Sequence, residues 1–201
     1  MSNMMIYRLK FMTVMFLTAK LQKRYVMSKK KRNCFVLYSL IRTFARMREK
    51  QLNLPAYDVR MSEKDGRQTI FDFLRNRYVA LTPEEWVRQH FTHFLVEHKG
   101  YPKGLLANET ELRVGSKRLR CDTALYDQSL RPRMIIEYKA PHIKIQQKTF
   151  DQIVVYNLLL HADYLVVSNG LQHYCCQMDY EHRSYTFLTD IPDYAAITPC
   201  R

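Results

Sequence analysis

The sequence predicts an α/β fold in which an antiparallel meander of three strands lies between two helices. Three observations support this prediction: a helix with clear start and stop signals, three strand segments separated by short turns, and a second helix followed by a buried strand and a tight turn. The chain has 201 residues, of which 47% are hydrophobic and 25% charged. These values are typical of one globular domain with an extension.

The net charge of +13 is concentrated at the amino terminus. The first fifty residues hold 13 Lys and Arg against one acid, Glu49, whereas residues 51–201 hold 19 basic and 18 acidic side chains. The expected fold is therefore nearly neutral, and the basic composition is weak evidence for a nucleic-acid partner. We divide the chain into a basic extension, residues 1–50, and a folded domain, residues 51–201.

Several interpretations of the extension stay open. The basic run from Lys29 to Arg32 is either a solvated tail or a site for phosphate or an acidic surface. Translation from Met47 would leave residues 1–46 outside the native fold. The longest apolar stretch, residues 11–19, is shorter than the roughly 20 residues that span a bilayer, so we expect no membrane partner.

The cysteines are odd in number and include no C-x-x-C pair, which argues against disulfides and zinc. Reduced thiols and the lack of a cleavage signal predict a cytoplasmic protein. Because neighbouring side chains on a strand point to opposite faces, we expect Cys175 and Cys176 to be one core and one surface residue.

The domain begins with a predicted hairpin and a helix. Residues 57–61 and 68–74 resemble two strands around a turn that contains Asp-Gly. Thr82, Pro83 and Glu85 then form an N-cap, a first-turn proline and a capping-box acid, which predict a helix over residues 83–98.

The remaining elements follow in quick succession. Strands are expected at residues 107–114, 119–126 and 133–139, and a second helix at residues 145–161. A buried strand at 164–168, a tight Asn169-Gly170 turn and a partner strand at 171–178 complete the prediction.

The third strand of the meander ends in an acid and a base. Strand periodicity places Glu137 and Lys139 on one face and Tyr138 on the other. A carboxylate beside an ammonium suits metal-assisted hydrolysis, and Asp122 supplies a second carboxylate on the preceding strand. The same Glu-x-Lys spacing at Glu97 lies at a helix end, where the two side chains diverge.

Gln152 and Tyr156 are four residues apart on the second predicted helix and therefore share a face. Together, Asp122, Glu137-x-Lys139 and Gln152-x-x-x-Tyr156 resemble the PD-(D/E)XK nuclease superfamily. The version with the downstream Gln and Tyr is similar to the N-terminal nuclease domain of the type I restriction enzyme restriction (R) subunit. The similarity spans residues 52–194 and includes the phrases at residues 81–88, 99–102, 139–141 and 167–170.

The resemblance implies a restriction-endonuclease-like mixed central sheet with an antiparallel meander, flanked by helices on both sides. It also implies that Asp122 and Glu137 bind Mg²⁺, for which Mn²⁺ would substitute, and that Lys139 helps to activate water. The Gln/Tyr pair would lie near the DNA backbone or support the site. Glu85 is the best match for a further metal ligand on the first helix, and its role in the helix cap explains it equally well.

Two departures limit the resemblance. Cys121 stands where the family usually has a proline, and the chain has no G-x-x-x-x-G-K-[ST] loop, so we expect no nucleotide and no ATP-driven motor. The resemblance predicts a Mg²⁺-dependent endodeoxyribonuclease whose partners are DNA and other restriction-modification subunits. The alternative is a non-catalytic or partner-dependent DNA-binding module of such a system.

Two further groups of residues have both a functional and a structural interpretation. His90 and His93 are three apart on the first helix, and we interpret them as surface or core-edge residues rather than metal ligands. Basic residues around the meander turns are either a phosphate-binding patch or a solvated region. They are Arg113, Lys117, Arg118, Arg120, Arg131 and Arg133.

Overall fold

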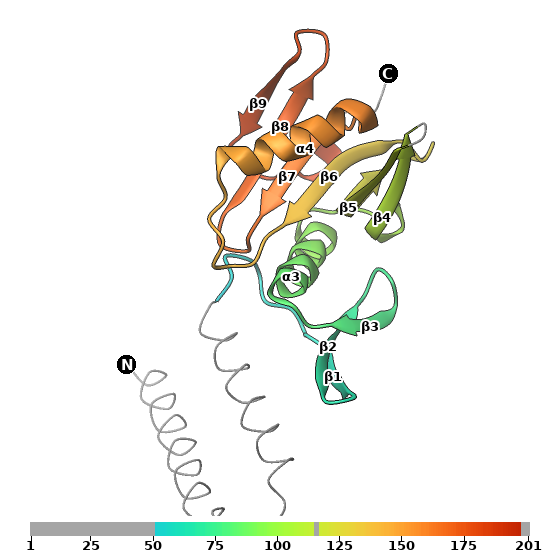
Figure 1. The fold of residues 1–201 in the computed structure, drawn as a ribbon, viewed down its shortest axis with the longest axis vertical. Coiled ribbons are helices and arrows are strands. Elements are labelled where there is room, and N and C mark those ends of the chain that lie inside the picture. Colours follow the sequence, from blue (N-terminus) through green and yellow to red (C-terminus); the bar gives the residue numbers. More distant parts are fainter. Residues whose placement is uncertain (1–50, 115–116, 198–201) are drawn as a thin grey trace, which may run out of the picture. The chain divides into compact units, whose positions relative to one another are not determined.

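The computed structural model describes residues 51–114 and 117–197, which all belong to one compact unit, Lys50–Arg201. Nine strands and two α-helices are described within these ranges, and two 3₁₀ turns at Lys103–Leu105 and Tyr194–Ala196 (Figure 1). The elements are β1 (Met61–Lys64), β2 (Arg67–Asp72), β3 (Arg77–Ala80), α3 (Pro83–His98), β4 (Leu106–Val114), β5 (Lys117–Tyr126), β6 (Pro132–Tyr138), α4 (Gln147–Leu160), β7 (Tyr164–Ser168), β8 (His173–Asp179) and β9 (Ser184–Leu188).

Six strands form the central sheet in the order β4-β5-β6-β7-β8-β9. Neighbouring strands are antiparallel except β6 and β7, which are parallel. Parallel neighbours need a crossover, and α4 supplies it; Figure 1 shows α4 lying across this part of the sheet. The predicted α/β class, with a mixed central sheet that contains an antiparallel meander, is confirmed.

The two helices cover opposite faces of the sheet. Along β6, Met134 and Ile136 belong to the core that contains the apolar side of α3, whereas Ile135 belongs to the core that contains α4. Strand β8 follows the same rule, and Cys175 and Cys176 are both buried, one in each core. The expectation that one of them lies on the surface is wrong, because a helix covers each face.

Helix α3 has the predicted bounds because its start is encoded in its first residues. The Thr82 hydroxyl accepts a hydrogen bond from the Glu85 amide at 3.0 Å, and Pro83 occupies the first turn. Val87, Phe91 and Leu95 are fully buried and lie one turn apart, so one stripe of the helix packs against the sheet.

The small sheet β1-β2-β3 differs from the predicted hairpin. Asp65 and Gly66 both have positive φ and form a two-residue turn that pairs Lys64 with Arg67. The first strand therefore ends at Lys64, and it begins at Met61. Tyr57, at the start of the predicted strand, lies outside β1 and stacks on His93 with ring centroids 3.8 Å apart.

Two strands were not predicted. Both β3 and β9 are short and largely exposed edge strands, so they lack the apolar alternation that reveals a strand in sequence. No helix among residues 51–114 and 117–197 is long and apolar enough to cross a membrane.

The chain turns at Asn169 and Gly170 as predicted, but the connection has four residues, because Ser168 pairs with His173 and β8 begins there rather than at Leu171. This turn also anchors the start of the domain. Gly170 has φ +80°, and its carbonyl accepts a hydrogen bond from the Asn53 amide at 2.7 Å. A Cβ at this position would lie 2.7 Å from Leu52 Cδ2 and 3.1 Å from Val87 Cγ2.

We expect Gly170→Ala to destabilise the fold by about 2–4 kcal/mol, because it combines a left-handed backbone penalty with overpacking. Gly66→Ala is the matched control, since Gly66 also has positive φ but no heavy atom within 4 Å of an added Cβ. That variant should lose only about 1 kcal/mol. Urea unfolding of both variants measures the difference, and equal losses would contradict the packing argument.

Candidate active site

The end of β6 brings the predicted acid and base together beside β5. Thr123 pairs with Ile136 across the β5–β6 ladder, so Asp122 and Glu137 occupy the next positions along the two strands. The Lys139 amide donates a hydrogen bond to the Ser168 carbonyl at 2.9 Å, which fixes the end of β6 to the end of β7.

The carboxylates of Asp122 and Glu137 are close enough to affect each other. Asp122 Oδ2 accepts a hydrogen bond from the Tyr138 amide at 2.9 Å, and Lys139 Nζ lies 2.9 Å from Glu137 Oε1. Burial and the nearby charge of Asp122 raise the pKa of Glu137, and the Lys139 ammonium only partly opposes this. The structure thus places Asp122, Glu137 and Lys139 together.

Arg88 on α3 is the centre of an ion-pair network at this site. Its side chain is buried, with 4% of the residue exposed. Nη2 lies 2.9 Å from Asp122 Oδ1, whereas Nη1 lies 3.0 Å from Glu85 Oε2 and 2.6 Å from Glu109 Oε1. One guanidinium therefore joins α3, β4 and β5.

Glu109 was not identified from the sequence. It has φ +54° in the middle of β4, between the pairs Asn108–Thr123 and Thr110–Cys121, and so lies across from Asp122. A non-glycine residue in this conformation costs on the order of 1–3 kcal/mol. Its carboxylate pairs with Arg88 and with Arg120. The sequence carries no signal for this backbone conformation, whereas the Glu85-x-x-Arg88 spacing on α3 does point to a helical ion pair.

Glu85 lies in the same network but is held by other groups. Oε1 accepts a hydrogen bond from Gln89 at 2.8 Å, Oε2 is bound by Arg88, and the Glu85 amide is part of the helix cap. Arg88 forms ion pairs with both Glu85 and Asp122, so the two carboxylates are connected through its guanidinium. Glu85 as a third metal ligand stays a prediction.

A buried polar chain supports the strands behind the site. Asn108 Nδ2 donates to Asp72 Oδ2 at 3.0 Å, and Thr123 Oγ1 donates to Asn108 Oδ1 at 2.6 Å. Asn108 directly precedes Glu109 on β4, and Thr123 directly follows Asp122 on β5. These hydrogen bonds therefore fix β4 against β5 beside the carboxylates.

The other predicted residues fall into two groups. Gln152 and Tyr156 lie within α4, but their side chains are outside the described part of the structure, as are those of Arg113, Lys117 and Arg118. The described arginines of the meander turns form ion pairs with acids of the same domain: Arg120 with Glu109, Arg131 with Asp127, and Arg133 with Asp163.

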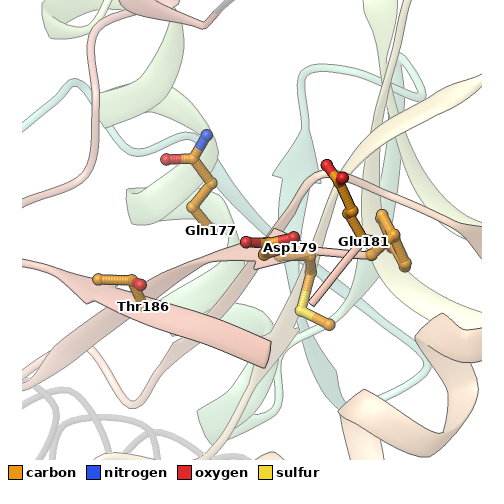
Figure 2. A pocket seen from close by; sticks show the side chains of 6 residues that line it. Gln177, Asp179, Glu181 and Thr186 are labelled. Atoms are coloured by element: carbon orange, nitrogen blue, oxygen red, sulfur yellow. The ribbon is translucent and has the colours of Figure 1, made fainter. Parts of the chain in front are cut away.

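A pocket on the β8–β9 hairpin is separate from this site. Figure 2 shows Gln177, Asp179, Glu181 and Thr186 around it, and Met178 and Tyr180 also line it. Asp179 pairs with His182 at 2.8 Å. None of the residues that line this pocket belongs to the Asp122–Glu137–Lys139 group, so we do not assign the candidate chemistry to it.

The donor set fits a hard divalent cation. Asp122 and Glu137 supply carboxylate oxygens, and Mg²⁺ is usually held by one or two carboxylates together with water and substrate phosphates. Burial, together with repulsion from Asp122, raises the pKa of Glu137, and a cation between the two carboxylates would relieve the repulsion. Within residues 51–114 and 117–197, no group of three or more His, Cys, Asp or Glu lies close enough to hold a metal.

Comparison with known proteins identifies the family. Residues 83–192 match the family described as the type I restriction enzyme R protein N terminus. The chain belongs to this family. The matched segment contains α3, the six-stranded sheet and every predicted site residue.

A fragment assigned as an HsdR subunit of a type I restriction enzyme from Vibrio vulnificus YJ016 is 18% identical, with a TM-score of 0.43. The match covers 58% of this chain and 24% of that one. No curated protein matches the chain.

We expect Glu137→Gln to stabilise the protein at neutral pH. The pKa of Glu137 is raised in the fold, so its ionisation costs stability as pH rises above the unfolded-state value, and glutamine removes that cost. Unfolding measured between pH 3 and pH 7 should show a stabilisation that disappears at low pH, where Glu137 is protonated.

Asp127→Asn is the control variant, for which we expect a stability change of the opposite sign. Hydrogen bonds from the Arg131 and Ser129 amides and the Arg131 charge lower the pKa of Asp127. That variant should lose stability at neutral pH and approach the wild type in acid. Destabilisation by Glu137→Gln at pH 7 would contradict our assignment of Glu137 as an electrostatically unfavourable residue.

Proposed function

We propose that the chain is a Mg²⁺-dependent endonuclease module that hydrolyses phosphodiester bonds in DNA. One observation carries the proposal: Asp122 and Glu137 occupy facing positions on the neighbouring strands β5 and β6, with Lys139 Nζ 2.9 Å from Glu137 Oε1. Membership of the R protein N-terminus family supports a restriction-enzyme setting for this group.

Asp122 and Glu137 are the residues that would hold the cation. Bound there, Mg²⁺ or Mn²⁺ would polarise a phosphate oxygen and lower the pKa of a coordinated water. Asp122 is held on one oxygen by Arg88 and on the other by the Tyr138 amide, which fixes the orientation of its carboxylate. A carboxylate oxygen has two lone pairs, so each still has a position for a cation.

Lys139 is the candidate for handling the attacking water. Its side chain is 31% exposed, so a substrate can approach it, and Glu137 holds its ammonium in place. In this position the ammonium would orient a water toward the phosphorus and offset the negative charge that develops on the phosphate oxygens.

DNA is the proposed substrate because phosphates suit the segment that follows the site. Between Tyr138 and Phe150 the sequence contains Lys139, Lys144 and Lys148 but no acid. Lys144 and Lys148 are exposed. The described arginines of the meander turns are paired with acids, so this segment is the better candidate for backbone contacts.

The first test is cleavage of supercoiled and linear DNA by the full chain with Mg²⁺ or Mn²⁺ and with EDTA. Lys139→Ala should cleave at least about 100-fold more slowly, because it removes the group that positions the water. Lys64→Ala, on β1, is the matched control and should cleave like the wild type.

Equal residual cleavage by wild type and Lys139→Ala would contradict the proposal, since it would indicate a contaminating nuclease. DNA binding without cleavage would instead favour a non-catalytic module or one that needs other restriction-modification subunits. Adding those subunits and repeating the assay separates these two outcomes.

A second test addresses the DNA contacts. The double substitution Lys144→Ala with Lys148→Ala should weaken DNA binding and reduce the slope of log affinity against log salt by about 2, because each phosphate contact contributes about 0.9. Binding is measured by fluorescence anisotropy at several salt concentrations. Lys64→Ala with Lys103→Ala removes the same charge elsewhere, and an equal slope change in that control would refute a local contact.

A further inference from the structure

The ion pairs of Arg88 reach the Asp122 carboxylate from the side of α3. Both terminal nitrogens are engaged: Nη2 with Asp122 at 2.9 Å, and Nη1 with Glu85 at 3.0 Å and Glu109 at 2.6 Å. The direction of Nη2 is therefore fixed by the carboxylates that hold Nη1, because the guanidinium is planar and rigid.

Glu109 is the element of this arrangement that regular secondary structure does not explain. Its φ of +54° interrupts an otherwise extended strand at the position across from Asp122. Backbone strain of this kind persists where surrounding contacts enforce it, and here those contacts are the ion pairs with Arg88 and Arg120.

We propose that Arg88 and Glu109 are positioning residues that orient Asp122 for cation binding. Glu109 holds Nη1 of Arg88, and Nη2 in turn holds Oδ1 of Asp122 while the Tyr138 amide holds Oδ2. This inference rests on the proposed function, because it assigns these residues to the same cation site. Neither residue touches the reacting atoms; both act through Asp122.

Charge-conserving variants test orientation rather than charge. Arg88→Lys keeps the positive charge but cannot bind several carboxylates with a fixed fork. Glu109→Asp keeps the negative charge and is better suited to a left-handed conformation, but its shorter side chain does not reach Arg88. The matched controls are Arg183→Lys and Glu181→Asp, both in the turn between β8 and β9.

The first readout is the thermal midpoint of the full chain titrated with Mn²⁺ alone. We expect both variants to need at least about tenfold more Mn²⁺ for half of the maximal shift, since loss of groups that orient metal ligands typically weakens binding by that factor or more. The controls should match the wild type. The second readout is DNA cleavage, in which saturating Mn²⁺ should restore most of the rate.

The outcomes separate this proposal from the proposed function. If the wild type shows Mn²⁺ stabilisation and cleavage, and both variants show the same Mn²⁺ dependence, the positioning role is wrong while the nuclease proposal stands. If the wild type shows neither, both proposals fail. Should Arg88→Lys not fold, Glu109→Asp decides the matter, because it retains Arg88 and two of its three carboxylates.

Discussion

Strand β6 is buried on both faces, and the position of the candidate site follows from this constraint. Alternate residues of β6 pack against α3 on one side and α4 on the other, and its central residues Met134, Ile135 and Ile136 are all apolar. The polar residues Glu137 and Lys139 follow at the end of β6, where they are only partly buried. The parallel pairing with β7 then fixes this end, because the Lys139 amide bonds to the Ser168 carbonyl.

The candidate site also requires a positive charge to balance its acidic residues. Glu85, Glu109 and Asp122 come from three different elements, and like charges in a partly buried region would repel each other. Arg88 reaches all three with one side chain, so a single positive charge offsets the repulsion between them. Removing one partner of such a set is costly, which makes α3 and the site mutually dependent.

The sequence predicted the parts of the fold that local chemistry controls. Helix α3 was predicted with the correct bounds because Thr82 and Pro83 determine its start. Strand β7 was predicted because its five consecutive residues form a buried strand. Edge strands β3 and β9 were missed, since exposed strands carry little apolar pattern. Asp122, Glu137 and Lys139 were selected from strand order and periodicity, whereas Glu109 depends on a backbone conformation and a long-range ion pair that no local pattern encodes.

The electrostatics of the carboxylates separate structural acids from the candidate site. Asp127 and Asp190 have lowered pKa values because hydrogen bonds and basic neighbours stabilise their charge. Burial alone would raise the pKa of Asp72, yet its hydrogen bonds from Arg75 and Asn108 bring it below its ordinary value.

Glu137 differs from these acids, because burial and the charge of Asp122 raise its pKa despite the bond to Lys139. A carboxylate whose charge the fold disfavours is typical of functional sites, where a ligand absent from the folding reaction supplies the missing stabilisation. A cation shared by Asp122 and Glu137 would supply that stabilisation at the end of β6.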